Sequence, residues 1–141
     1  MTHPAIKYAD QVLSGKVLAC KWVRLACERF IFDLEEVESG QRTDIYFDWD
    51  TVARVSRFYE LCPHFKGEWA GNPIILEPWQ DFCNANIFGW KFTDTGFRRF
   101  KTIYETVGRK NGKTTMIAPA GLYFLYADDE PGAEVYSAAV D

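Results

Sequence analysis

The residues best suited to chemistry lie between Thr106 and Thr115, in the sequence TVGRKNGKTT. Gly-Lys-Thr ends the phosphate-binding loop pattern, in which backbone N–H groups surround the phosphates and a lysine reaches the β- and γ-oxygens. The pattern is incomplete, because Val107 stands where a glycine is expected five positions before Gly112. These few letters are a weak signal alone, so the elements on either side decide the interpretation.

Side chains in and before this loop supply candidate groups for binding a nucleotide. Lys113 is the candidate phosphate-binding lysine, and the hydroxyl of Thr114 is the candidate Mg²⁺ ligand. Gln80, in LEPWQ, has one donor and one acceptor face, as paired hydrogen bonds to the adenine edge require. Arg109 and Lys110 would add positive charge beside a triphosphate. The predicted cofactors are ATP and Mg²⁺, and the predicted cofactor-binding residues are Gln80, Arg109, Lys110, Asn111, Gly112, Lys113, Thr114 and Thr115.

Other kinds of chemistry have less support in the sequence. His3 and His64 have no carboxylate or cysteine at ligand spacing, and the four cysteines form no Cys-x-x-Cys pair, which indicates reduced thiols of a cytosolic protein. The net charge of -4 argues against coating nucleic acid by bulk electrostatics. No signal peptide or long apolar span is found, so we expect no membrane association.

Periodicity predicts the helices that must position the loop. The segment 15–39 predicts one long helix that ends at Gly40, because its apolar residues repeat at spacings of four and three. Asp50 is the expected cap of a second helix, which Pro63 ends. A third helix is predicted over 78–88, with a proline at its first position. The apolar face of the first helix is Val23, Cys27, Phe30, Leu34 and Val37.

Strand signals surround the glycine-lysine loop. A hairpin is expected with its turn at 94–96 and a second arm through 98–107, followed by the loop, a buried helix within 114–128 and a short strand over 134–140. The predicted fold class is therefore α/β, an incomplete P-loop NTPase sheet made of the first βαβ unit plus a hairpin and preceded by a helical N-terminal segment. The predicted domains are a helical segment over 1–67 and the first half of a P-loop ATPase domain over 68–141.

The succession LEPWQ, IFGW, TGFRRFKTIYETVGRKNGKTT and EVYSAA resembles the large terminase subunit of tailed bacteriophages, the motor ATPase that pumps DNA into an empty capsid. The N-terminal GKVLACKWVRLACERFIFDL also looks like the leading helices of that family. Members of the family carry a variant loop with an Arg-Lys-x-Gly-Lys-[Ser/Thr] core. RKNGKT fits that core, which accounts for Val107 at the usual glycine position.

The resemblance implies roles for individual residues. Gln80 matches the adenine-recognition motif, Lys113 and Thr114 match the lysine and the magnesium-bound hydroxyl of Walker A, and Arg109 matches an arginine near the γ-phosphate. Lys113 and Arg109 are thus the candidate catalytic residues. In the full-length family the partners are double-stranded DNA, the small terminase subunit and the portal protein. The implied location is the cytoplasm of a bacterial host, for a protein encoded by a phage or prophage.

The resemblance also implies a fragment, truncated before Walker B and the nuclease, because the strand ending in Asp-Glu, the coupling motif and the RNase H-like nuclease of the family are not found. We therefore expect the isolated chain to hydrolyse ATP slowly or not at all. An unpaired sheet edge would also favour self-association. Two other interpretations stay open, a fragment of a P-loop DNA helicase-like motor and a non-enzymatic prophage remnant.

Overall fold

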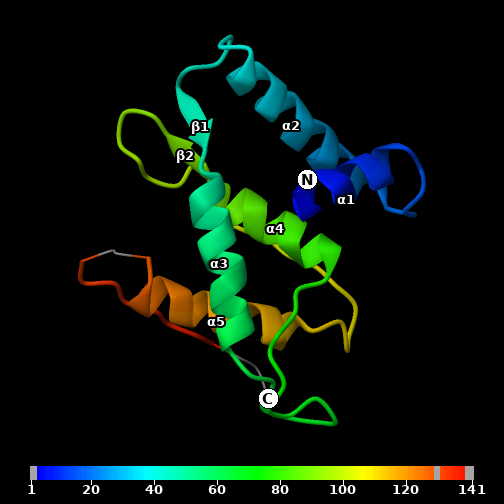
Figure 1. Ribbon diagram of the computed structural model, residues 1–141, viewed down its shortest axis with the longest axis vertical. Coiled ribbons are helices and arrows are strands. Elements are labelled where there is room, and N and C mark those ends of the chain that lie inside the picture. The colour runs from blue at the N-terminus through cyan, green and yellow to red at the C-terminus, as the bar shows by residue number, and fades with distance from the viewer. Residues whose placement is uncertain (1–2, 129–130, 139–141) are drawn as a thin grey trace. The chain divides into compact units, whose positions relative to one another are not determined.

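A computed structural model describes residues 3–128 and 131–138 of the chain. The chain divides into two compact units, the first formed by residues 1–56 and 76–104 and the second by residues 57–75 and 105–141. Each unit is described by itself below. The elements, labelled in Figure 1, are α1 (Pro4–Leu13), α2 (Lys21–Glu38), β1 (Ile45–Phe47), α3 (Trp49–Leu61), α4 (Pro78–Gly89), β2 (Trp90–Phe92) and α5 (Lys113–Tyr126).

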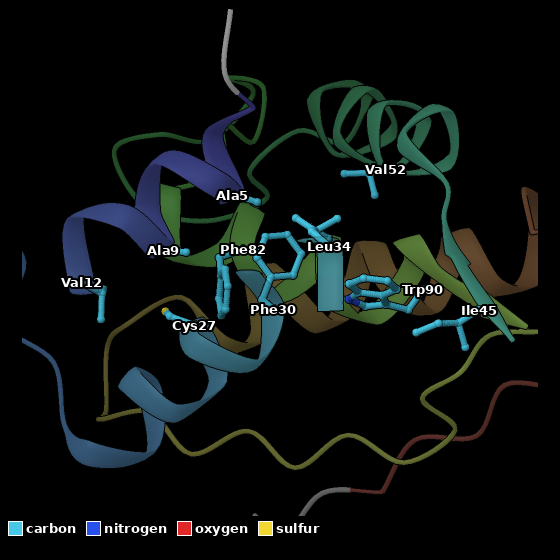
Figure 2. Close-up of a cluster of buried hydrophobic side chains, with 11 residues drawn as sticks. Ala5, Ala9, Val12, Cys27, Phe30, Leu34, Ile45, Val52, Phe82 and Trp90 are labelled. Atoms are coloured by element: carbon cyan, nitrogen blue, oxygen red, sulfur yellow. The ribbon is translucent and has the colours of Figure 1, made fainter. Parts of the chain in front are cut away.

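Helices α1, α2 and α4 form the core of the first unit. Helix α1 packs against both of the others and buries the small side chains of Ala5, Ala9 and Val12. Figure 2 shows Phe30 of α2 and Phe82 of α4 at the centre of the cluster, where their ring centroids lie 5.4 Å apart, edge to face. The sequence analysis did not predict α1, although its buried residues recur at helical spacings of four and three.

The long helix predicted over 15–39 is confirmed for Lys21–Glu38, as α2, whereas residues 15–20 form no helix. Cys27, Phe30 and Leu34 are buried on its core face. The helix ends where predicted, because Gly40 has a φ of 73°, a left-handed conformation that glycine adopts without steric cost. The third predicted helix is likewise confirmed as α4, with Pro78 at its start.

The two strands form a small antiparallel sheet in which Ile45 lies opposite Phe92 and Phe47 lies opposite Trp90. The sequence analysis did not predict β1, which is only three residues long. The sheet approaches the end of α4 so closely that a Cβ at Gly89 would overlap the ring of Phe47. Glycine is therefore required at this position for the sheet to pack.

The predicted hairpin turn at 94–96 is confirmed, but its second arm is short. The backbone N–H of Phe92 donates to Phe97 O at 2.9 Å, the N–H of Arg99 donates to Trp90 O at 2.9 Å, and Arg98 forms an isolated bridge with Lys91. Residues 101–107 pair with no strand among the residues described. The strand predicted over 98–107 is therefore wrong beyond its first residues, because residue types that favour strands form one only where a neighbour pairs their backbone groups.

The P-loop sheet and its first βαβ unit are accordingly not confirmed. The fold is mixed, with helices and a two-stranded antiparallel sheet, which is compatible with part of an α/β fold. In the last predicted strand, residues 134–138 form no strand, and residues 139 and 140 lie outside the described residues. No helix in the described part is long and apolar enough to cross a membrane.

Buried charge joins the parts of the first unit. Asp33 of α2 has a side chain only 3% exposed and accepts from Arg42 Nη1 at 2.7 Å and from Arg99 Nη1 at 2.6 Å. Arg42 follows α2, and Arg99 lies in the segment that returns from the hairpin turn. Because a buried carboxylate is costly unless it is paired, Asp33 fixes both segments to the helix.

The cap of α3 is Asp48, not Asp50 as the sequence analysis expected. The carboxylate of Asp48 accepts from the backbone N–H of Thr51 at 2.9 Å, while Asp50 lies in the first turn. Lys91 of β2 donates to Asp48 Oδ2 at 2.6 Å and to Thr51 Oγ1 at 2.9 Å. Asp48 and Asp50 lie on either side of Trp49, and either could cap the helix. The cation that holds Asp48 in the cap position, Lys91, comes from a strand distant in sequence.

In the second unit, α5 packs on the last turn of α3. The Tyr59 hydroxyl donates to the carbonyl of Met116 at 2.6 Å, and the rings of Phe58 and Tyr123 meet edge to face at 5.4 Å. The predicted helix is confirmed as α5, with Pro119 inside it, but it is not buried throughout, because Ile117 and Tyr126 are exposed. Because proline has no N–H, it interrupts the backbone hydrogen-bond ladder of this helix.

We predict that Asp33→Asn lowers the free energy of unfolding by roughly 3 kcal/mol, because it leaves two guanidinium groups without their buried counter-charge. Asp44→Asn is the matched control, since Asp44 also pairs with Arg42 but is 63% exposed, and should cost less than about 1 kcal/mol. Urea unfolding followed by tryptophan fluorescence measures both. Equal losses for the two variants would contradict this ranking.

The second stability prediction concerns pH. Burial raises the pKa of the Asp48 carboxyl, but hydrogen bonds from Lys91 and Thr51 outweigh that effect and lower the pKa from 3.8 to about 2. A lowered folded-state pKa means that the stabilisation is complete above about pH 4 and is lost as the pH falls toward 2. We expect Asp48 to account for about 1–2 kcal/mol of this acid-induced loss.

The measurement is urea unfolding of the wild type and of Asp48→Asn at several pH values from about 2 to about 7, a range that includes the change expected from linkage at roughly pH 2–4. The variant should be less stable near neutral pH and should lose less stability on acidification. Parallel curves for the two proteins would be inconsistent with a low pKa for this carboxyl.

Candidate functional site

The glycine-lysine loop is a tight turn that leads directly into α5. Lys110 has a φ of 66° and Gly112 has a φ of 71°, so two left-handed residues lie on either side of Asn111. The left-handed conformation costs a lysine roughly 1 kcal/mol. Gly112 is the N-cap residue of α5, and its carbonyl accepts from the N–H of Met116 at 2.9 Å, which starts the helix.

The side chain of Lys113 folds back across this loop. Lys113 is the first residue of α5, and its Nζ donates to the carbonyl oxygen of Val107 at 3.1 Å. The bond closes the segment from Val107 to Lys113 into a ring. The valine that replaces the expected glycine therefore contributes a backbone carbonyl, a group that every residue type has.

The predicted site residues in the loop are adjacent and accessible. Arg109, Lys110, Asn111, Lys113 and Thr114 are exposed, whereas Gly112 and Thr115 are partly buried. No side chain caps the first turn of α5, so no side-chain acceptor occupies the N–H groups there. These N–H groups point out of the N-terminal end of the helix, which carries partial positive charge. The arrangement gathers backbone donors, cationic side chains and hydroxyl groups beside one turn.

Glu105 is a charged neighbour that the sequence analysis did not single out. Its Oε1 is buried and has no hydrogen-bond partner among the described residues. Burial raises the pKa of its carboxyl, and the positive charge of Lys113 opposes that shift. Glu105 therefore lies close enough to influence the loop lysine. An acidic residue within TIYETV was the available signal, but sequence alone gives no sign of its burial.

Gln80 belongs to the first unit, whereas the loop belongs to the second. It is only 8% exposed, and its Oε1 accepts from the backbone N–H of Glu77 at 2.9 Å, in a capping box at the start of α4. Gln80 thus has a structural role at the helix terminus. Its acceptor is engaged in this bond, while its amide nitrogen makes no hydrogen bond within the described part of the chain.

Asn84, one turn after Gln80 on α4, was also missed by the sequence analysis. It is 1% exposed, and neither its Oδ1 nor its Nδ2 has a hydrogen-bond partner in the structure as described. Residues four apart share one face of a helix, so α4 carries two buried amides on the same side. Nothing in the letters of PWQDFCNAN distinguishes Asn84 from an exposed asparagine.

Metal-binding groups are sparse. No group of three or more His, Cys, Asp or Glu side chains that could hold a metal ion occurs within residues 3–128 and 131–138. The four cysteines form no disulfide within the described residues, and Cys27 is buried whereas Cys20 is exposed. The exposed hydroxyl of Thr114 is an oxygen of the loop that could ligate Mg²⁺, and phosphate oxygens would have to complete most of the coordination.

Comparison with known families identifies the part of the chain that contains the loop. Residues 78–141 match the family model described as terminase large subunit, ATPase domain. The match starts at the first residue of α4 and includes Gln80, the loop and α5. The resemblance to the large terminase subunit is thereby confirmed for this segment. No curated protein and no solved structure matches the chain.

We predict that the carboxyl pKa of Glu105 lies above that of a glutamate in an unfolded chain, because burial disfavours its charged form. In Lys113→Ala the pKa should rise further, since the favourable positive charge is lost. Carbon-detected NMR titration of the side-chain carboxyl measures both values, and Lys66→Ala is the control for loss of an exposed lysine in the same unit. An unchanged pKa in Lys113→Ala would show that the two groups do not interact.

Proposed function

We propose that this chain is an N-terminal part of a phage large terminase and that its loop binds ATP for the motor that packages viral DNA. In this proposal residues 68–141 are the first half of a P-loop ATPase domain, and residues 1–67 are a helical segment that precedes it. The match of residues 78–141 to the terminase ATPase domain family supports the assignment. Nucleotide binding, rather than rapid turnover, is the activity proposed for the isolated chain.

The observation that carries the proposal is the closed loop at the start of α5. Lys113 Nζ lies 3.1 Å from the carbonyl of Val107, so the ammonium is held over the turn rather than extended into solvent. The exposed N-terminal end of α5 favours an anion, as helix N-termini do generally. When the β- and γ-phosphates enter, Lys113 exchanges a carbonyl acceptor for charged oxygens, which form stronger hydrogen bonds.

The other loop residues have proposed roles that follow from their chemistry. Arg109 and Lys110 supply additional positive charge, with Arg109 assigned to the γ-phosphate. Asn111, Gly112 and Thr115 contribute the polar and backbone groups of the turn, and the hydroxyl of Thr114 binds Mg²⁺. The bound nucleotide supplies the phosphoryl group for transfer. The cationic and backbone groups of the loop fit a triphosphate, and for Mg²⁺ the one ligand proposed from the protein is Thr114.

Gln80 is proposed to recognise adenine, with one modification to the expectation from sequence. Its Oε1 already accepts from the N–H of Glu77, so Nε2 is the group available to donate to a ring nitrogen of the base. A second hydrogen bond at Oε1 remains compatible with the chemistry, since an amide oxygen has two lone pairs. Gln80 would then cap α4 and contact the base at the same time.

The wider context of the proposal follows from the terminase family. In a complete terminase the motor acts on double-stranded DNA, together with the small subunit and the portal protein, in the cytoplasm of the bacterial host. Fast hydrolysis requires a carboxylate that activates water. Glu105 is the acidic residue beside the loop, but its buried oxygen and its interaction with Lys113 suit it to positioning the lysine rather than to activating water.

We predict that Lys113→Ala weakens ATP binding about 10- to 100-fold, because a hydrogen bond to a charged group contributes roughly 1.5–3 kcal/mol. Titration with a fluorescent ATP analogue in the presence of Mg²⁺ measures the affinity. Lys66→Ala removes another exposed lysine of the second unit and should bind like the wild type.

Thermal melting of both variants, followed by circular dichroism, separates loss of binding from loss of folding. Equal affinity of Lys113→Ala and the wild type would refute the role of the loop. A folded wild type that binds no nucleotide would instead favour the non-enzymatic remnant.

A further inference from the structure

Helix α2 carries an apolar surface in addition to its core face. Trp22 is 75% exposed, Leu25 is 43% exposed and Phe32 is 56% exposed. Together with Arg29, these residues follow one another at spacings of three, four and three, which places them along one side of a helix. We call this set, Trp22, Leu25, Arg29 and Phe32, the α2 stripe. Single exposed apolar residues are normal on a protein surface, but an aligned set indicates an interaction surface.

The charged side chains of α2 are basic at its N-terminal end and acidic at its C-terminal end, which is the reverse of the order that stabilises a helix. The first turn contains Lys21 and Arg24 and no acidic residue, whereas the last six residues, DLEEVE, contain acidic residues and no basic one. The N-terminal end of a helix carries partial positive charge and its C-terminal end partial negative charge. Both ends of α2 therefore repel their own side chains, and helix stability alone does not explain this sequence.

Contacts within the chain compensate only part of this pattern. Arg24 donates to the carbonyl of Val12 at 3.0 Å, at the end of α1, and Asp33 is paired with two arginines. Four charged residues of α2 form no ion pair among the described residues. They are Lys21 near one end of the helix and Glu35, Glu36 and Glu38 near the other. Of these, Lys21 lies four residues before Leu25 and Glu36 lies four residues after Phe32, so these two charges lie at the two ends of the α2 stripe and are available to a partner.

We infer that two copies of this chain associate through their α2 stripes, with the helices antiparallel. The antiparallel arrangement places the basic first turn of each helix beside the acidic last turn of the other, and it also opposes the two helix dipoles favourably. A two-fold axis brings the α2 stripe of one copy against the α2 stripe of the other. The charges at the ends of the stripe are complementary only when the two helices are antiparallel. Another partner would have to supply the apolar and charged pattern that a second copy already has.

The inferred contact is independent of nucleotide binding and of the self-association expected from an unpaired sheet edge. Both requirements, an apolar stripe and complementary charge, are met within α2 alone. A single helix face forms a small interface, and small interfaces give weak, reversible association. The dimer is therefore expected at micromolar concentrations and should weaken as salt screens the flanking charges.

Charge reversal tests the orientation. In sedimentation equilibrium at low ionic strength, Lys21→Glu and Glu36→Lys should each weaken dimerisation about tenfold, because the two-fold axis makes each substitution act twice. The double variant Lys21→Glu/Glu36→Lys should regain the wild-type dissociation constant, because the antiparallel pairing is restored with reversed signs. A double variant as weak as the single variants would overturn the antiparallel arrangement.

Removal of apolar surface tests the location of the contact. Phe32→Ser should abolish the dimer, and at a concentration low enough for the wild type to be monomeric it should leave the melting temperature unchanged, because Phe32 is 56% exposed. Ile75→Ser is the control, since Ile75 is 79% exposed but lies outside α2, and it should leave dimerisation unchanged. A wild type that stays monomeric at all concentrations, or an equal loss in both variants, would overturn the inference.

Discussion

The placement of the Lys113 ammonium is the constraint on which the functional account of this chain depends. Its hydrogen bond to the Val107 carbonyl forms because the backbone reverses within a few residues, through left-handed conformations at Lys110 and Gly112. The same reversal places the start of α5 and the hydroxyl of Thr114 beside the exposed cationic side chains of the loop. Without that turn, these groups would not lie beside one another.

The first unit is held together by a different constraint, the pairing of carboxylates with cations from distant segments. Asp33 fixes the segment after α2 and the return from the hairpin, and Asp48 joins the start of α3 to β2. Around them, α1, α2 and α4 bury an aromatic cluster. The residues of α2 that are buried in this packing, among them Cys27, Phe30 and Leu34, lie on a different side of the helix from the exposed α2 stripe.

The sequence predicted the elements whose signals are local. Helical periodicity, Pro78 and Gly40 were sufficient for α2 and α4, and the motif was sufficient to place the loop and the lysine at the start of α5. Helix α1 was missed although its pattern was present, and β1 is too short for a strand signal. The strand expected over 98–107 failed beyond its first residues because pairing depends on a neighbour, which propensity cannot supply. Tertiary contacts, which leave no trace in residue order, determine the burial of Asn84 and of one oxygen of Glu105 and the choice of Asp48 over Asp50.

Backbone amide NMR of the wild-type chain titrated with Mg²⁺ and ATP tests whether the loop before α5 binds the phosphates, because it reports on each N–H group in the loop. If the loop binds the phosphates, the largest chemical-shift changes should occur at Gly112, Lys113 and Thr114, where the amides at the start of α5 would meet the phosphates. Saturable shifts confined to other segments, or no shifts at all in a folded protein, would contradict it.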